Sequence, residues 1–132
     1  MLIDAVTGEV LCVIDLDTVM PSFVFSDYGD FLRTGASTAA EDEPDLSKID
    51  FDMDIYRAFT DGYLSEAESF LTPLERSMLP FAVRLFPYMQ ATRFLTDYIN
   101  GDTYYKTIGP EHNLVRTRAQ LALLDAIDRR LP

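Results

Sequence analysis

The sequence has 132 residues, 48% of them apolar, and a formal net charge of −11 at pH 7. This length and apolar content allow one domain with a hydrophobic core and exclude a largely disordered chain. The charge opposes binding to nucleic acid or an anionic membrane surface, the single cysteine excludes a disulfide framework, and no apolar run is long enough to span a bilayer. We expect one cytoplasmic domain over residues 1–132, without a signal peptide, because no basic segment precedes an apolar one at the N-terminus.

The predicted elements begin with a β-hairpin. Met1–Ile3 and Val10–Ile14 are short apolar runs rich in β-branched residues, and Gly8 between them can adopt a positive φ at no steric cost. The second run is apolar at every position, which is typical of a strand buried on both faces. We therefore expect Cys12 to be an inert core residue. Because an isolated two-stranded hairpin is marginal in water, we also expect the hairpin to pack against something larger.

An irregular segment follows, and then four or five helices. The first is predicted over residues 27–35, capped by Ser26 or Asp27 and ended by Gly35. The stretch over residues 36–50 includes Glu41-Asp42-Glu43-Pro44-Asp45 and reads as an acidic loop. It belongs to the strongly acidic first part of the chain, since residues 1–54 hold 13 acids and 2 bases whereas residues 55–132 hold nine of each. A second helix is predicted from about Asp52 to Leu64.

Two longer helices complete the chain. Thr72-Pro73-Leu74-Glu75 has the pattern of a capping box with proline at the first helical position, and the helix that it begins ends at Asn100-Gly101. Pro80 and Pro87 interrupt its hydrogen-bond ladder, so we expect either a kinked helix or two helices in line. The last helix is predicted from about Glu111 to Leu131, with its inward-facing residues at Leu114, Leu121, Leu124, Ile127 and Leu131.

Two carboxylates follow the hairpin directly. Asp15 and Asp17 lie two residues apart, so in an extended chain they point to the same side, where they repel each other unless a cation or a proton lies between them. Hard oxygen ligands suit Mg²⁺, which takes one or two carboxylates and leaves its other positions to water and phosphate. The alternative is that both are solvated loop acids, because Asp-x-Asp is a common pattern.

Two blocks of sequence carry a family resemblance. Residues 13–21 (Val-Ile-Asp-Leu-Asp-Thr-Val-Met-Pro) and 27–36 (Asp-Tyr-Gly-Asp-Phe-Leu-Arg-Thr-Gly-Ala) closely resemble the aminoglycoside-phosphotransferase-like kinases, and within them the N-acetylhexosamine 1-kinase branch. Residues 93–98 with Gly101-Asp102, and residues 112–114 with Arg116 and Gln120, agree with it. The resemblance covers nearly the whole chain. It implies an α+β, mainly helical fold like the C-terminal lobe of a protein-kinase-like enzyme, with Mg²⁺, ATP and a small-molecule sugar as reactants.

The resemblance also implies roles for individual acids. Asp15 matches the acid that holds Mg²⁺ on the nucleotide phosphates, and Asp17 is its nearby alternative or assistant. Asp30 best matches the acid that supports the catalytic loop by hydrogen bonds, with Asp27 as the second choice. A helix N-cap is the competing role for Asp27.

Residues of the later helices are weaker candidates. The resemblance places Arg93 near the acceptor sugar, although Arg93 and Asp97 lie one helical turn apart and could simply form an ion pair. Asn113 and Arg116 share one face of the last helix with Gln120, either as the lining of the acceptor site or as a solvated polar face. The sequence contains no Ser or Cys nucleophile motif that could pair with His112, so no catalytic triad is expected. The tyrosines at 104 and 105 are expected to pack rather than to stack on a ligand.

The parts of such a kinase that perform the chemistry match no residue of this sequence. In these enzymes the general base, the Asn that binds Mg²⁺ and the Lys that grips ATP all precede the hairpin. We therefore expect the C-terminal fragment of a phosphotransferase that is inactive as this chain alone. Its candidate partners are a missing N-terminal lobe and a second copy of the chain. The rival hypothesis is a non-catalytic helical interaction module, or a complementation module that receives the lobe from a separate chain.

Overall fold

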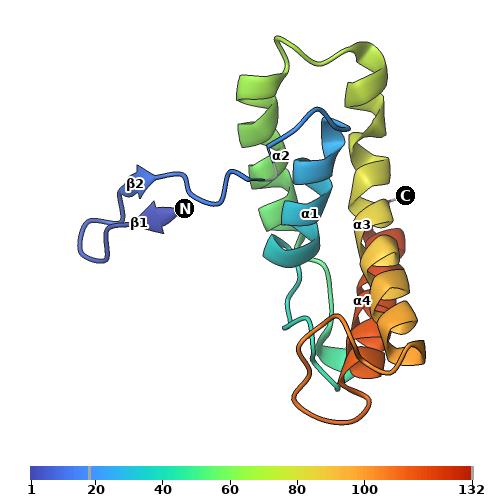
Figure 1. The fold of residues 1–132 in the computed structure, drawn as a ribbon. Coiled ribbons are helices and arrows are strands. Elements are labelled where there is room, and N and C mark those ends of the chain that lie inside the picture. Colours follow the sequence, from blue (N-terminus) through green and yellow to red (C-terminus); the bar gives the residue numbers. More distant parts are fainter. Residues whose placement is uncertain (18, 132) are drawn as a thin grey trace.

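The structure, a computed structural model, describes residues 1–17 and 19–131. The strands are β1 (Leu2–Ile3) and β2 (Val10–Cys12), and the helices are α1 (Phe25–Gly35), α2 (Met53–Ala67), α3 (Pro73–Ile99) and α4 (His112–Arg130), with a short 3-10 helix η1 (Leu46–Lys48) ahead of α2. The four α-helices form one body, and the hairpin stands away from it on an extended linker (Figure 1). The predicted α+β, mainly helical fold with an N-terminal hairpin is confirmed.

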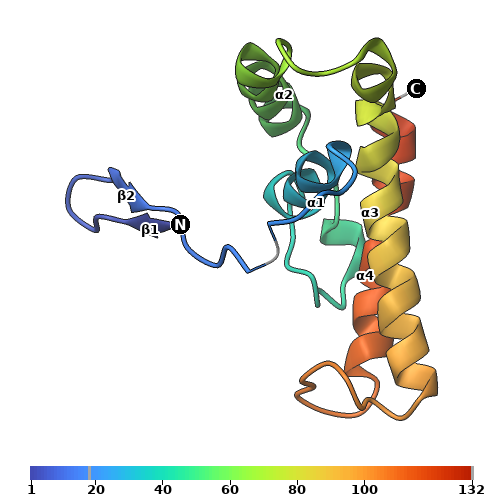
Figure 2. The ribbon, with the colours of Figure 1, turned by 45° about the horizontal axis from the view of Figure 1, so that its top comes forward.

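The hydrophobic core lies where α1, α3 and α4 meet. Figure 2 shows α3 and α4 side by side along most of their length, with α1 against the first half of α3. Gly29 of α1 permits the close approach, because a Cβ at this position would lie 2.8 Å from the carbonyl oxygen of Ala82 and 2.5 Å from the Phe86 ring. The core side chains that are almost fully buried include Tyr28, Leu32, Val83, Leu123, Ala126 and Ile127.

The boundaries of α3 follow the local sequence. Its N-terminus has the predicted capping box, in which the Glu75 amide donates to Thr72 Oγ1 at 3.3 Å and the Thr72 amide donates to Glu75 Oε2 at 2.8 Å. Pro80 and Pro87 both lie inside one continuous helix rather than between two helices in line. The packing of buried residues around them against α1 and α4 offsets the two lost backbone hydrogen bonds.

The start of α1 differs from the prediction. The N-cap is Val24, without a side-chain hydrogen bond, so the predicted caps at Ser26 and Asp27 are wrong. The helix begins two residues earlier because Phe25 packs against the core from its first turn. Asp27 then falls within that turn, where a carboxylate interacts favourably with the positive end of the helix dipole.

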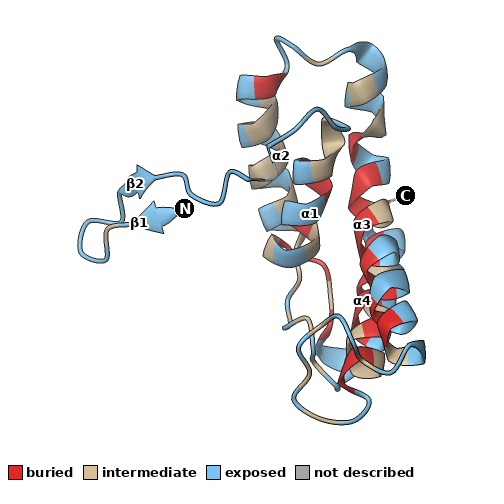
Figure 3. Ribbon diagram, viewed as in Figure 1, coloured by how far each residue is buried: buried red, intermediate tan, exposed pale blue. Residues whose placement is uncertain are grey.

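The hairpin has the predicted turn but not the predicted burial. Gly8 has a φ of +73°, and Asp4 Oδ1 accepts hydrogen bonds from the Val6 and Thr7 amides, each at 2.8 Å. However, β2 is exposed along its whole length, so the expected burial of residues 10–14 on both faces is wrong, and Cys12 is exposed rather than in the core. An apolar run predicts burial only where a covering surface exists, and the helical body does not reach the hairpin (Figure 3).

The inward face of α4 was also mispredicted. Leu121 is 46% exposed, and of the five predicted inward positions only Ile127 is fully buried. The interface with α3 instead uses small residues such as Ala119 and Ala126 together with the polar Asn113, Thr117 and Gln120. Short side chains let the two helices approach closely, and among the leucines of α4 Leu123 is buried, Leu114 and Leu124 are half-buried and Leu121 is exposed. None of the helices in the described part of the chain is long and apolar enough to cross a membrane.

Candidate functional site

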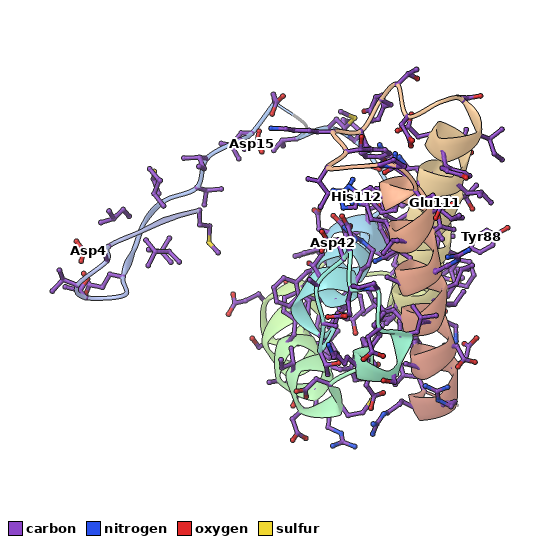
Figure 4. All side chains as sticks on the ribbon, turned by 90° about the horizontal axis from the view of Figure 1, so that it is seen from below. Asp4, Asp15, Asp42, Tyr88, Glu111 and His112 are labelled. Carbon is purple, nitrogen blue, oxygen red and sulfur yellow. The ribbon has the colours of Figure 1, made fainter. Side chains whose placement is uncertain are left out.

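The two predicted metal ligands lie on the linker between the hairpin and the helical body. Asp15 and Asp17 are both exposed, and neither forms a hydrogen bond or ion pair with another described residue. Asp15 has a φ of +64°, a left-handed conformation that Asp tolerates better than most residues. Figure 4 shows Asp15 on the linker, well separated from Asp42 and His112. Its carboxylate is therefore free to take an external ligand.

The carboxylate oxygens of Asp15 and Asp17 are the ligand type that suits a hard cation such as Mg²⁺, which keeps most of its hydration shell. No group of three or more His, Cys, Asp or Glu side chains that could hold a metal occurs in residues 1–17 and 19–131. Two carboxylates alone do not enclose an ion, but Mg²⁺ commonly uses one or two carboxylates and fills its remaining positions with water and phosphate oxygens. Asp15 and Asp17 could therefore supply at most two ligands to such an ion, and their role in binding Mg²⁺ remains a prediction.

A hollow of about 920 Å³ brings two of the four predicted acids together. Asp15 and Asp27 both line it, along with apolar linker residues and with Tyr63 and Phe70 of the α2 end of the molecule. Tyr63 donates its hydroxyl to the Val24 carbonyl at 3.3 Å, and burial, assisted by the charge of Asp27, raises the pKa of Tyr63. Neither Asp17 nor Asp30 lines this hollow.

Asp30 has a different set of contacts. It is exposed on α1 and forms an ion pair with Arg33 one turn later, 3.0 Å from Oδ1 to Nε. The Arg33 guanidinium also binds Glu41 at 2.6 Å, so it anchors the acidic loop to α1. In the described structure Asp30 therefore orients an arginine, and its predicted role in supporting a catalytic loop remains a prediction.

A second hollow, of about 460 Å³, lies beside the last turns of α3 and the loop that follows. Its lining combines hydroxyl, amide, guanidinium and aromatic groups, from Thr92, Arg93, Thr96, Asp97, Asn100, Thr103, Tyr104 and Tyr105. The Arg93 guanidinium lies 5.5 Å from the centre of the Tyr105 ring and donates to Gln90 Oε1 at 3.4 Å. Arg93 therefore faces the hollow, and the alternative of an ion pair with Asp97 is not formed.

The wall of this hollow depends on the Asp97 carboxylate. Asp97 is only 5% exposed and accepts the backbone amides of Thr103, Tyr104 and Tyr105 at 3.0, 2.8 and 2.9 Å. Asn113 of α4 donates to the same carboxylate at 2.8 Å. Burial by itself would raise the pKa of Asp97, but these four hydrogen bonds outweigh it and hold the pKa below its usual range.

Asn113 and Arg116 support the wall from behind. Asn113 is fully buried, and its Nδ2 also donates to Asp102 Oδ1 at 2.8 Å. Arg116 donates to the Asn113 side-chain oxygen and to the Lys106 carbonyl, both at 3.3 Å, and its guanidinium lies 5.3 Å from the centre of the Phe94 ring. Neither residue lines the hollow. The expectation of a solvated polar face here is wrong, because Asn113 and Gln120 are both buried.

The two tyrosines of the loop differ in their surroundings. Tyr105 packs on Phe94 with 4.8 Å between ring centres, and its hydroxyl accepts from Gln90 Nε2 at 3.3 Å. Tyr104 lies edge-on to Tyr105 but is 75% exposed. The expectation of packing is thus confirmed for Tyr105, whereas Tyr104 presents an open aromatic face at the hollow.

The role of Asp97 was missed by sequence reasoning, which considered only its i,i+4 spacing from Arg93. A signal was present in the Asn100-Gly101-Asp102 run that follows, where Gly101 and Asp102 both adopt a positive φ and turn the chain back over the end of α3. Such a turn aims consecutive amides at the preceding helical turn, where an acid can accept them. No family model matches the sequence.

Replacing Asp97 by asparagine is expected to release the loop while leaving the helices folded. Asparagine offers one acceptor oxygen and places an NH₂ group against backbone donors, so the amides of residues 103–105 should lose at least about tenfold in hydrogen-exchange protection. Because the folded pKa of Asp97 is depressed, the wild-type loop should stay closed above the ordinary carboxyl pKa and open only as the pH falls through the lower folded value. Asp61→Asn, an exposed change on α2, is the matched control, and equal protection in the two variants would contradict this role.

Proposed function

We propose that this chain is the C-terminal part of an ATP-dependent phosphotransferase that acts on a small hydroxyl compound of the N-acetylhexosamine type. The observation that carries the proposal is the state of Asp15, the residue that the resemblance assigns to Mg²⁺. It lies on the linker that follows β2, is exposed, and has no protein partner in the described part of the chain. Asp4 and Asp97, in contrast, accept hydrogen bonds from backbone amides.

Mg²⁺ would be held by Asp15, with Asp17 assisting. When bound, the ion neutralises charge on the nucleotide phosphates. The contribution of the chain is to hold two carboxylates on one short linker segment. Asp27, on the same hollow as Asp15, adds negative charge that favours a cation there.

The hollow beside α3 is the proposed site for the acceptor sugar. Its volume of about 460 Å³ is in the range of small-ligand sites, and its hydroxyl and amide groups at Thr92, Thr96 and Asn100 suit the hydroxyls of a sugar ring. The open face of Tyr104 suits the apolar face of the ring, and Arg93 supplies a fixed donor. Asn113 and Arg116 would then act on the sugar through the wall that they support.

The exposed hairpin and the linker after it favour a second candidate function, that of an interaction or complementation module. Apolar side chains of the hairpin and linker stay in water, including Val10, Leu11, Val13 and Ile14, which are between 46% and 64% exposed. Monomeric proteins rarely expose contiguous apolar surfaces of this kind unless a partner covers them. The occupant that we propose is the polypeptide that carries the catalytic loop and the nucleotide-binding lobe, since the base, the Asn and the Lys of the reaction must come from outside residues 1–132.

The test is reconstitution in trans. The chain is mixed with a polypeptide comprising the N-terminal lobe and catalytic loop of an N-acetylhexosamine 1-kinase, and ADP release is measured with ATP, Mg²⁺ and N-acetylglucosamine. We expect sugar-dependent ADP release at least about ten times that of either polypeptide alone, and none from the chain alone. Turnover by the chain alone near the usual kinase range of about 1–100 s⁻¹ would contradict the assignment of the missing groups.

Two binding measurements separate the candidate functions. N-acetylglucosamine should perturb the NMR signals of Tyr104 and Tyr105, and the added lobe should perturb those of residues 10–16. Binding of the lobe without sugar binding or turnover would favour the non-catalytic module. If neither the lobe nor the sugar binds, both proposals fail.

A further inference from the structure

His112 joins two loops that are far apart in sequence. It is the only histidine of the chain, lies at the first position of α4 and is 8% exposed. Its Nε2 lies 3.2 Å from Oδ2 of Asp42 in the acidic loop, and its Nδ1 lies 3.3 Å from the Ile108 amide nitrogen in the loop that follows α3. Figure 4 shows the Asp42 and His112 side chains next to each other at this end of the molecule.

The two contacts determine which nitrogen carries the proton. A backbone amide can only donate, so Nδ1 must accept from Ile108 and is unprotonated. The ring proton is then on Nε2, which donates to the Asp42 carboxylate. Only this neutral tautomer satisfies both contacts, because a doubly protonated ring has two donors and no acceptor.

We propose that His112 is a proton-operated latch that holds the loop of residues 103–111 against the acidic loop in its neutral form and releases Ile108 when it takes up a proton. Addition of one proton to Nδ1 converts that atom from acceptor to donor, so the bond from the Ile108 amide is lost. The contact with Asp42 survives and becomes an ion pair. The acidic loop therefore stays attached while the 103–111 loop loses its hydrogen bond at Ile108.

The charged groups around the ring set the balance between the two states. Asp42 lies in the acidic loop. Its hydrogen bond with His112 lowers the pKa of Asp42 more than burial raises it, so this pKa lies below its usual range. Arg116, one turn along α4, acts on Asp42 as well. Three further acids lie near the ring. Glu111 precedes His112 at the N-cap of α4, and Asp97 and Asp102 both accept hydrogen bonds from Asn113, the residue that follows His112.

The latch would make the attachment of the loop that lines the hollow beside α3 depend on pH. Ile108 lies three residues after Tyr105, and the same loop supplies Thr103, Tyr104 and Tyr105 to the hollow. The Asp97 hydrogen bonds hold the start of this loop and His112 holds its end. Release at Ile108 removes the attachment nearest α4, while the bonds to Asp97 and the bond from Arg116 to the Lys106 carbonyl remain. This inference concerns the loop itself and stands whether or not the chain takes part in phosphate transfer.

The experiment is an NMR titration of the 132-residue chain from pH 8 to pH 5, the range in which histidines as a class change charge. Because the chain has one histidine, its ring nitrogen signals are unambiguous. We expect the Nε2–H tautomer at pH 8, and a fall of about fivefold to tenfold in the exchange protection factor of Ile108 as the ring becomes protonated, with Leu123 in the core of α4 unchanged. An Nδ1–H tautomer, or constant protection at Ile108, would overturn the proposal.

Two variants make the titration specific. His112→Gln retains an acceptor and a donor but cannot titrate, so the Ile108 response should vanish. Asp42→Asn retains an acceptor for Nε2, so the Nε2–H tautomer and the loss of Ile108 protection on ring protonation should both be kept, as in the Asp61→Asn control. If His112→Gln does not fold, the wild-type titration decides by itself, and an Ile108 protection factor that does not change when the ring is protonated excludes the latch.

Discussion

Asp15→Asn is expected to lower the rate of phosphate transfer by the reconstituted enzyme at least about 100-fold. Phosphoryl transfer depends almost entirely on positioning and on electrostatic stabilisation, and loss of one such group at a reacting centre typically costs a factor of 10² to 10³. Asparagine has nearly the shape of aspartate but no charge for Mg²⁺. Because Asp15 is exposed and unpaired in the described structure, the variant should fold as the wild type does. The measurement is ADP release at saturating ATP over a range of Mg²⁺ concentrations.

The Asp15 prediction has controls on the same chain. Asp17→Asn should cost less than Asp15→Asn, since Asp17 assists, and Asp61→Asn on α2 should have no effect. Mn²⁺ in place of Mg²⁺ adds a readout that does not depend on turnover, because its paramagnetism should broaden the NMR signals of residues 13–17 in the wild type and not in Asp15→Asn. An Asp15→Asn enzyme that keeps at least half of its activity would refute the metal role.

Gly29→Ala is expected to destabilise the helical body by about 1–3 kcal/mol. In an isolated helix, alanine is favoured over glycine by about 1 kcal/mol. Here the added Cβ would lie 2.8 Å from the Ala82 carbonyl oxygen, a backbone atom, and 2.5 Å from the Phe86 ring, so α1 and α3 must move apart. Overpacking of a close interface costs more than the propensity gain. Urea unfolding followed by circular dichroism should show a lower midpoint at an unchanged slope.

Gly62→Ala is the matched control for the Gly29 prediction. Gly62 also lies in a helix, α2, but nothing lies within 4 Å of a Cβ built there. This substitution should stabilise the chain by about 0.5–1 kcal/mol through helix propensity and the unfolded state. If both substitutions shift the urea midpoint in the same direction, the close packing of α1 on α3 does not determine which side chain position 29 tolerates.

Elements that are decided by neighbouring residues were predicted well from the sequence. The capping box at Thr72 and Glu75 and the positive φ of Gly8 both depend on contacts within a few residues, and both are present. The end of α3 likewise follows from the local Asn100-Gly101 signal, whereas α1 ends at Gly35 without a positive φ there, and Ala36 is its C-cap. Similarly, the position of Asp15 at the end of the hairpin, the basis of the proposed metal site, can be seen in the sequence alone.

Burial was predicted less well, because it depends on which surfaces meet. Residues 10–14 are apolar enough for a core, yet they are exposed because no helix of the body covers them. Asn113 and Gln120 are polar enough for a surface, yet they are buried because α4 packs on α3 through its short residues.

The order of the elements, the acidic first part of the chain and the pair of carboxylates after the hairpin can all be recognised from the amino-acid sequence. The place of Asp97 in the wall of a hollow, and the pairing of His112 with Asp42, 70 positions earlier, appear only once the chain is folded. This difference comes from the range of the interactions. Turns and caps are closed by atoms a few residues apart, whereas the partners of a buried carboxylate or imidazole are brought to it by distant segments.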